Sequence, residues 1–238
     1  MTMKKTVLVM ALLALSIGGA FAHALWIETA STGKKGQAQE VKIFFGEYEE
    51  NQPDSTTKWF SNLKDFSLLL TAPNGAARIL KTAADVHCFK ASFTPDQDGT
   101  YTLSVVHEVK TIYEHAKIAY YAFAHVAVGN VPKINTVYPA NALFTIHPSE
   151  AVVKAGTSVP HQVLYNKAPF ATQKLTVVDT ERKKQEPVTD VNGKFDFKPA
   201  QRGNYFLEAF KEDATPGELD GKKYDKVWHV VTYFVQAQ

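Results

Sequence analysis

The sequence has very little cysteine, since Cys88 is the only one in 238 residues. One cysteine cannot form an intramolecular disulfide, which excludes the framework of bridges that stabilises many small exported domains. A lipid-anchored precursor would carry a cysteine at its cleavage point, and none is present there. Burial of apolar side chains must therefore stabilise the fold, and 45% hydrophobic content is enough for it. We expect Cys88 to be buried in a strand as a small hydrophobic residue.

Long apolar runs are also scarce. The one over residues 6–15 is short for a membrane-spanning helix, which needs about 20 residues. Two lysines precede this run, and Ala20-Phe21-Ala22 follows it with the small-x-small spacing that signal peptidase recognises. We therefore predict that residues 1–22 are a cleaved signal peptide. The mature chain would begin at His23, would be periplasmic or secreted, and would have no membrane span.

Neither sign of charge dominates the chain. Its formal net charge is +2, and removal of residues 1–22 takes away two lysines and no acidic residue. The mature chain would keep 24 basic and 24 acidic side chains and be formally neutral. A neutral chain without a basic stripe is a poor ligand for polyanions. We therefore expect no nucleic-acid partner.

Sequence motifs of the common catalytic sites are absent. The chain has no Gly-x-Ser-x-Gly elbow, no His-Glu-x-x-His pair, no phosphate-binding loop and no dinucleotide fingerprint. These absences favour a protein that is not an enzyme, and we predict no catalytic residues and no organic cofactor.

What the sequence does contain is β-structure. Beyond the predicted leader, short segments rich in β-branched and aromatic residues alternate with turn signals, and no segment has a helical period. The predicted strands are 40–46, 65–71, 88–93, 101–109, 117–128, 143–147, 158–166, 173–179, 194–198, 204–210 and 224–235. Residues 130–142 hold two prolines without regular alternation, which indicates a linker. We predict an N-terminal β-sandwich over 23–129, this linker, and a C-terminal β-sandwich over 143–238.

The two halves share a motif. The pattern Phe-x-Pro-x-x-x-Gly-x-Tyr-x-Leu begins at Phe93 and again at Phe197, 104 residues later. Proline opens a turn, glycine adopts backbone angles that other residues avoid, and tyrosine and leucine then face the core. The pattern is similar to the tyrosine corner of immunoglobulin-like sandwiches. The predicted fold class is therefore all-β, with two tandem immunoglobulin-like β-sandwich domains.

The position of His23 suggests a metal site. Cleavage after Ala22 would leave this histidine with a free α-amine, whose reference pKa is near 8. An amine and an imidazole on one residue form a bidentate nitrogen chelate that suits copper(II) or nickel(II). Glu28 and Glu47 are candidate oxygen ligands or hydrogen-bond partners of a ligand. A competing cleavage before Leu25 would remove the histidine and with it the hypothesis.

Further ligands must come from elsewhere in the chain. His107 shares a strand face with core residues and adjoins Glu108, so both are candidates. His115 follows a predicted turn, from which it could reach a cluster at the strand ends. His125 is a weaker candidate because His229 lies 104 residues later, in register with the repeat, which indicates an inherited strand position. The candidate metal ligands are therefore His23, His107, Glu108, His115 and His125.

At this point the residues resemble a known family. The sequence is similar to an uncharacterised bacterial periplasmic family whose members are often labelled as components of nickel or cobalt uptake systems. The segments that carry the resemblance are His23-Ala-Leu-Trp-Ile-Glu28, Phe45-Gly-Glu47, Gly99-Thr-Tyr-Thr-Leu103, His107-Glu-Val-Lys110, Tyr165-Asn-Lys-Ala-Pro169 and Asp190-Val-Asn-Gly-Lys-Phe195. The resemblance implies export and β-sandwich domains. It also implies that His23, the aromatic Trp26 and His107 correspond to features of the family.

Three functional hypotheses follow. The first is a periplasmic binding protein that captures or delivers a divalent transition metal ion (nickel, copper or cobalt), with a membrane transporter component as its partner. The second is a copper oxidoreductase in which His23 forms a histidine brace, although the chain lacks disulfides and a flat aromatic face for a polymer. The third is a non-catalytic adhesion module that binds a protein or a glycan.

Overall fold

The computed structural model describes residues 23–131 and 133–238, so the predicted signal peptide over 1–22 lies outside the described residues. The described chain is almost entirely β-structure, with two short 3-10 helices, η1 (Thr56–Lys58) and η2 (Leu63–Asp65). The all-β class predicted from the sequence is confirmed. No helix of the described residues has the length and apolar character needed to cross a membrane.

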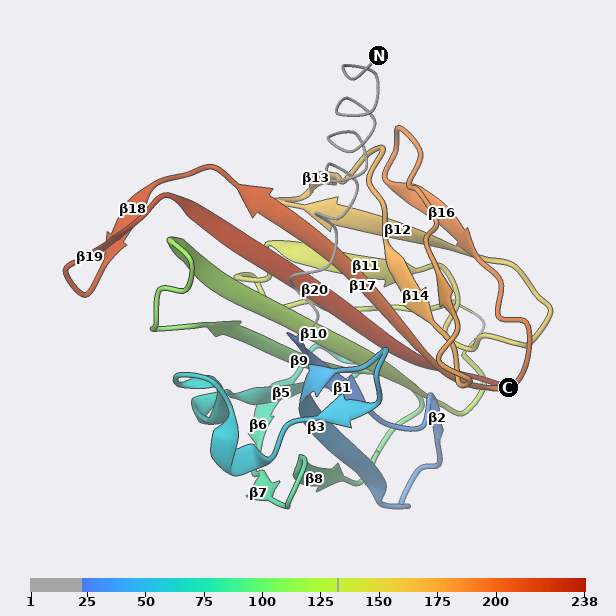
Figure 1. Cartoon of the computed structure of the whole chain (residues 1–238). Helices are drawn as coiled ribbons and strands as arrows, with labels where there is room; N and C mark the ends of the chain where they lie inside the picture. The colour runs from blue at the N-terminus through green and yellow to red at the C-terminus, as the bar shows by residue number, and fades with distance from the viewer. Residues whose placement is uncertain (1–22, 132) are drawn as a thin grey trace, which may run out of the picture.

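Three sheets form the body of this part of the chain (Figure 1). The N-terminal sheet has the order β1-β3-β8-β7, with β4 paired to β3; its strands are β1 (His23–Glu28), β3 (Gln39–Glu47), β4 (Gln52–Pro53), β7 (Ala83–Ala84) and β8 (Phe89–Phe93). The C-terminal sheet has the order β11-β12-β13, with β16 paired to β12; its strands are β11 (Phe144–Pro148), β12 (Val159–Tyr165), β13 (Ala168–Pro169) and β16 (Lys194–Phe197).

The central sheet is the largest of the three and takes strands from both halves of the chain. Its order is β15-β14-β17-β20-β10-β9-β5-β6, with β2 paired to β10. Its strands are β2 (Thr32–Gly33), β5 (Leu68–Thr71), β6 (Ala77–Leu80), β9 (Gly99–Glu108), β10 (Ala116–Val128), β14 (Thr176–Val178), β15 (Lys184–Gln185), β17 (Gly203–Asp213) and β20 (Lys226–Ala237). A separate hairpin of β18 (Gly217–Leu219) and β19 (Lys222–Tyr224) extends from the end of β17 and β20 (Figure 1).

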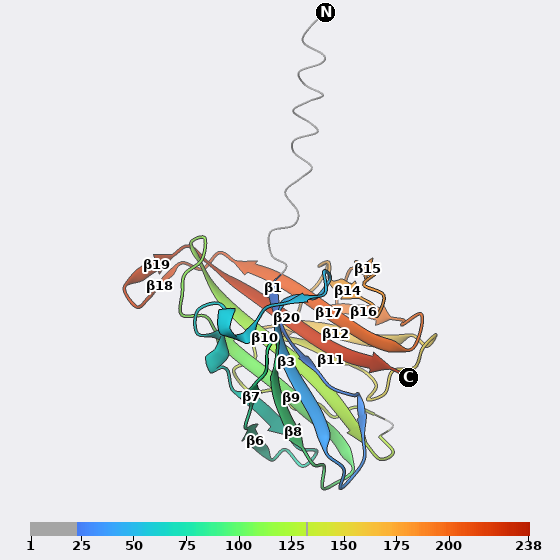
Figure 2. The ribbon, with the colours of Figure 1, turned by 60° about the horizontal axis from the view of Figure 1, so that its bottom comes forward.

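The central sheet is covered on both faces. Along β10, Tyr120 and Ala122 lie in the core beneath the N-terminal sheet, whereas Tyr121 and Phe123 lie in the core beneath the C-terminal sheet. Successive residues of a strand point to opposite faces, so both faces of β10 must be apolar, which explains its continuous hydrophobic sequence. Figure 2, with the N-terminal sheet turned toward the viewer, shows β1 lying over β10 and β20.

The two halves are joined by a parallel pair of strands. β10 of the first half pairs with β20 of the second, with Tyr120 opposite Val230. Each predicted sandwich therefore contributes part of one shared sheet, with the N-terminal and C-terminal sheets on its opposite faces. The residues described between β10 and β11 form no strand. The domain limits at 129 and 143 stay a prediction.

The repeated motif forms a tyrosine corner in each half. The hydroxyl of Tyr101 accepts a hydrogen bond from the Gln97 N–H (3.1 Å), and the hydroxyl of Tyr205 accepts one from the Gln201 N–H (3.1 Å). The glycine two residues before each tyrosine has a positive φ, +130° in the first corner and +138° in the second. The repeat therefore encodes the same turn twice, because it depends on local contacts within a few residues.

Arg182 ties the second half to the first from the turn between β14 and β15. Its Nη1 donates to the Tyr48 carbonyl oxygen (2.6 Å) and its Nη2 donates to Asn51 Oδ1 (2.6 Å). The guanidinium also lies 4.2 Å from the centre of the Tyr48 ring. These contacts hold the loop that joins β3 to β4.

Candidate functional site

The candidate site begins with β1, a strand that the sequence did not predict. β1 pairs antiparallel with β3, and the register places His23 directly opposite Glu47. The His23 Nδ1 lies 3.2 Å from Glu47 Oε1, and the Nε2 lies 3.6 Å from Asp54 Oδ2. The imidazole is 48% exposed, so both ring nitrogens face carboxylates at the surface. The start of β1 thus places one imidazole and two carboxylates together at the surface.

A glycine brings Asp54 to the ring. Gly46 has φ +143°, and a Cβ built there would lie 2.5 Å from the Gln52 carbonyl oxygen. This lets the short strand β4 fold back on β3, and the Asp54 N–H donates to the Phe45 carbonyl oxygen (2.8 Å). The Phe45-Gly46-Glu47 segment thus supplies one carboxylate directly and positions the second through its turn.

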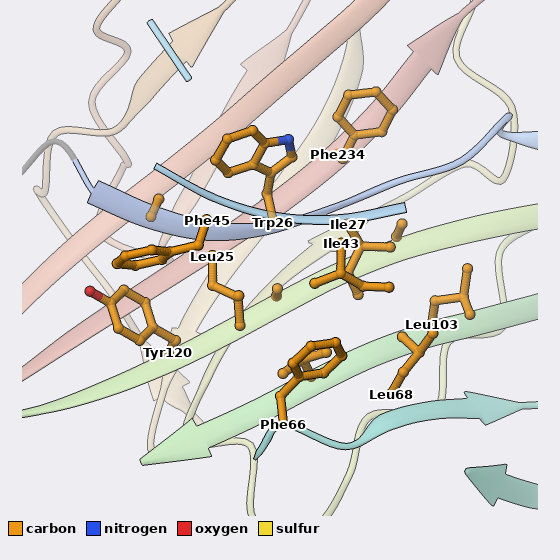
Figure 3. Close-up of a cluster of buried hydrophobic side chains, with 14 of the residues drawn as sticks. Leu25, Trp26, Ile27, Ile43, Phe45, Phe66, Leu68, Leu103, Tyr120 and Phe234 are labelled. Atoms are coloured by element: carbon orange, nitrogen blue, oxygen red, sulfur yellow. The ribbon is translucent and has the colours of Figure 1, made fainter. Parts of the chain in front are cut away.

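An aromatic layer lies beneath the imidazole. The Phe45 ring is tilted against the His23 ring at 5.5 Å between centroids, and the Tyr120 ring meets Phe45 edge-on at 5.8 Å (Figure 3). The Tyr120 hydroxyl donates to the His23 carbonyl oxygen at 3.4 Å. Burial raises the pKa of Tyr120 well above its usual value, so the phenol stays protonated and acts as a donor. This layer holds His23 by both its ring and its backbone.

His107 lies on the same face of the central sheet as Tyr120. Its Nε2 is buried and has no hydrogen-bond partner among the described residues, and burial lowers its pKa, which keeps the imidazole neutral. Thr102 pairs with His125, and the Val109 N–H donates to the Ile118 carbonyl oxygen (2.9 Å), so the same register runs along β9 and β10. This register places His107 opposite Tyr120, the phenol that contacts His23. No ion pair or hydrogen bond joins the two histidines in the described part of the chain.

Glu108 and His115 lie apart from the imidazole of His23. Glu108 is exposed, alternates with His107 along β9, and pairs with Lys117 Nζ at 2.8 Å. His115 is exposed in the turn between β9 and β10, where its φ is +61° and its carbonyl oxygen accepts the Asp225 N–H (2.8 Å). The structure brings neither side chain to His23, because one points to the opposite face and the other lies in a turn beyond the strand end.

His125 is separated from His23 by the central sheet. It is buried in the core beneath the C-terminal sheet, with its ring 5.3 Å from the Tyr233 ring and 5.9 Å from the Tyr138 ring. Burial lowers its pKa to about 3. Residues of odd number on β10, such as Phe123, face the C-terminal core, whereas Tyr120 faces the N-terminal core. Alternation along one strand therefore places His125 on the opposite face of the central sheet from His23, and the structure does not bring the two together.

No group of three or more His, Cys, Asp and Glu side chains in the described chain is arranged to hold a metal ion, and this includes the group described above. His23, Glu47 and Asp54 supply one imidazole and two carboxylates from side chains. The fourth donor predicted from the sequence, the α-amine of His23, arises only after cleavage.

Comparison with known proteins places the chain in a family. The family described as Domain of unknown function (DUF4198) matches residues 20–213. The chain belongs to this family. The sequence matches no curated protein. Nothing in this family match concerns nickel or cobalt, so the uptake label stated above for the resemblance finds no support in it.

Two solved structures show distant similarity. One is the BSP domain of a biofilm associated protein, with 10% sequence identity, a TM-score of 0.24, and coverage of 87% of this chain and 29% of that one. The other is a DUF4785 family protein from Legionella pneumophila, with 15% identity, a TM-score of 0.31, and coverage of 84% of this chain and 54% of that one. The chain thus spans only part of the length of both proteins.

The DUF4198 match includes every residue of the candidate site. It begins at residue 20, before His23, and extends past Glu47, Asp54 and Tyr120. Of these, the sequence indicated His23 and Glu47 but neither Asp54 nor Tyr120. The available signal for Asp54 was Gly46, because a glycine within an alternating strand marks a bulge or a close backbone approach. Tyr120 carried no such signal, since it is one of several aromatic residues on β10.

Proposed function

We propose that this DUF4198 protein is an exported binding protein for a divalent transition metal ion (nickel, cobalt or copper). The processed N-terminus would bind the ion through the α-amine and the Nδ1 of His23, and Glu47 would supply an oxygen donor. Asp54 would balance the charge from the other side of the ring. Such a set combines nitrogen and oxygen donors of the kinds that these ions accept.

One observation carries this proposal. His23 is the first residue after the predicted cleavage point, and its half-exposed imidazole lies between the carboxylates of Glu47 and Asp54. A residue that was merely left by cleavage would not need a paired strand, a glycine-dependent turn and an aromatic layer to hold it. The neutral His107 imidazole on the same side of the sheet is the next donor to test.

The exposure of the site favours exchange over storage. A binding site that is open on one side lets a partner approach the ion without unfolding the protein, as capture and delivery require. We therefore propose a role in metal uptake in the periplasm, with a membrane transporter component as the receiving partner. We propose no catalytic role.

The test begins with the terminus. Intact mass of the exported protein should show His23 as its first residue. Calorimetric titration of that species with copper(II), nickel(II), cobalt(II) and zinc(II) should then show tight one-to-one binding of at least one ion. Glu47→Gln should weaken binding by about tenfold, or about 1.4 kcal/mol. His87→Gln should leave it unchanged, because His87 is exposed in a loop.

Other outcomes would favour the remaining hypotheses. A terminus at Leu25, or a correctly processed protein that binds none of the four ions at neutral pH, would refute metal binding and favour the adhesion module. Hydrogen peroxide production by the copper-loaded, reduced protein would favour the copper oxidoreductase.

A further inference from the structure

The edge of β1 that does not pair with β3 determines the direction of the backbone nitrogen of His23. One edge of β1 pairs with β3, and the other lies against side chains of the central sheet. On that second side, the His23 carbonyl oxygen accepts the Tyr120 hydroxyl (3.4 Å), and the Leu25 carbonyl oxygen accepts the Thr232 hydroxyl (2.7 Å). The N–H and C=O of one residue point to the same side of a strand. The nitrogen of His23 therefore also points toward the central sheet.

A carboxylate lies on that side. Glu208 of β17 is paired with Thr232 of β20, whose hydroxyl contacts the strand that begins with His23. Side chains at even positions of β17, such as Phe206, face the N-terminal core, so Glu208 faces β1. Beside burial, a negative charge on Glu208 raises the pKa of Tyr120, the phenol at the His23 carbonyl. Glu208 therefore lies next to Thr232, on the face of the central sheet that β1 covers.

Glu208 lacks a cation of its own. It is half-buried, and no described residue forms an ion pair or a hydrogen bond with its carboxylate. The charged groups that face it are Lys184 and Glu49, and the Lys184 ammonium is already shared by Glu49 (3.4 Å) and Glu186 (3.6 Å). Burial raises the pKa of Glu208 to about 8. A carboxylate in such surroundings gains from a nearby positive charge or N–H donor.

Cleavage of the predicted signal peptide would supply such a positively charged donor. In the unprocessed chain the nitrogen of His23 is a peptide N–H without charge. Cleavage after Ala22 converts it to an α-amine on the side of β1 that faces Glu208.

We propose that Glu208 is a positioning residue for the processed N-terminus, and that its carboxylate accepts a hydrogen bond from the α-amine of His23. This inference rests on the proposed function, because it assumes that the mature chain begins at His23. By holding the amine, Glu208 would keep the amine and the Nδ1 of the same residue oriented as one chelate. The ion would then find both nitrogen donors already in place, which reduces the entropy lost on binding.

The deciding experiment measures the pKa of the α-amine without any metal. The chain that begins at His23, verified by intact mass, is labelled at its amine with 13C by reductive methylation and titrated by NMR. A neighbouring carboxylate stabilises the ammonium form, so Glu208→Gln should lower the amine pKa by about half a unit or more. Glu208→Asp should restore part of the difference. Glu212→Gln is the matched control, because Glu212 lies on the same strand but pairs with Lys226 (2.7 Å).

A second measurement connects the amine to metal binding. At about pH 9 most of the amine is deprotonated, so proton competition contributes little. Glu208→Gln should then weaken nickel(II) or copper(II) binding about tenfold, with an unchanged circular dichroism spectrum that shows an intact fold. Equal amine pKa values in the wild-type protein and Glu208→Gln would overturn the inference.

The metal-binding function and the positioning role of Glu208 can be refuted independently of each other. If the wild-type protein binds none of the tested ions but Glu208→Gln still lowers the amine pKa, the metal function is wrong and the contact of Glu208 stands. If metal binding depends on His23 but the amine pKa is the same in the wild-type protein and Glu208→Gln, the metal function stands and the positioning role is wrong.

Discussion

Two regions of this molecule use histidine in opposite ways: the surface at the start of β1 and the core beneath the C-terminal sheet. At the start of β1, His23 is 48% exposed, and its ring nitrogens face Glu47 and Asp54. Beneath the C-terminal sheet, His125 and His161 are buried among aromatic rings, and burial lowers their pKa values to about 3 and about 4. The same side chain is therefore a candidate ligand where water and carboxylates surround it, and a neutral core residue where they do not. Residue type alone does not distinguish these roles.

The largest expected effect is acid destabilisation of the core beneath the C-terminal sheet. An unfolded histidine titrates near pH 6.5, whereas folded His125 titrates at about 3 and His161 at about 4. The unfolded chain therefore binds more protons as the pH falls below 6.5, and stability decreases from there until the folded values are reached. Together the two histidines should cost roughly 8 kcal/mol across this range. Urea unfolding at several pH values measures it.

His125→Phe isolates the buried histidine in that experiment. Phenylalanine keeps the ring and removes both nitrogens, which have no hydrogen-bond partner among the described residues. The variant should lose part of the pH dependence and should be at least as stable at pH 7. His87→Gln should keep the full pH dependence. Identical slopes for wild type and His125→Phe would show that His125 is not neutral in the core.

The next largest effect concerns His23. An alanine added before His23 converts its amine to a peptide nitrogen while leaving the imidazole in place. Metal affinity should fall about a hundredfold, or about 2.7 kcal/mol. The midpoint of urea unfolding should stay unchanged, because the exposed ring contributes little to the core. Calorimetry of the two species side by side provides the measurement, and equal affinities would mean that the amine is not a ligand.

The tyrosine corners should be unequal. The Tyr101 hydroxyl accepts from the backbone N–H of both Asp96 and Gln97, whereas the Tyr205 hydroxyl accepts only from that of Gln201. Tyr101→Phe should therefore cost about 2 kcal/mol and Tyr205→Phe about 1 kcal/mol. Urea unfolding of the two variants compares them directly. The reverse order would show that contacts outside the corners dominate.

The glycines of the corners provide the matching steric test. A Cβ at Gly99 would lie 2.6 Å from the Pro73 Cβ, and one at Gly203 would lie 2.9 Å from the Thr180 Cβ. Both residues also have positive φ, so Gly99→Val and Gly203→Val should each destabilise the fold by about 1 kcal/mol or more. Chemical denaturation of both variants measures the cost. A variant as stable as wild type would mean that the turn relaxes without strain.

The smallest effect is expected where the halves meet. Arg182→Lys keeps the positive charge but loses the paired bonds to Tyr48 and Asn51 and the planar contact with the Tyr48 ring. We expect a loss of about 1 kcal/mol in the free energy of unfolding, measured by urea denaturation. Arg202→Lys, in the turn before β17, should change less because no such hydrogen bonds hold Arg202 within the described residues.

Local sequence features predicted much of the fold. The predicted strand 117–128 is observed as Ala116–Val128, and 88–93 as Phe89–Phe93. The tyrosine corners were predicted from a motif, because a turn of a few residues depends on chemistry that the motif contains. The strand β1 was missed because its continuous apolar residues lack the alternation of a half-buried strand.

For the site, the sequence by itself determined that a histidine follows a predicted cleavage point and that a Phe-Gly-Glu segment lies nearby in the chain. Only the tertiary structure decided which groups surround that histidine. Alternation states which face a side chain occupies but not which strand lies next to it. Glu208 lies on the face of the central sheet that β1 covers because β20 pairs in parallel with β10, a contact between residues about a hundred positions apart. The same pairing places His125 behind the sheet, because every residue of β10 must face one core or the other.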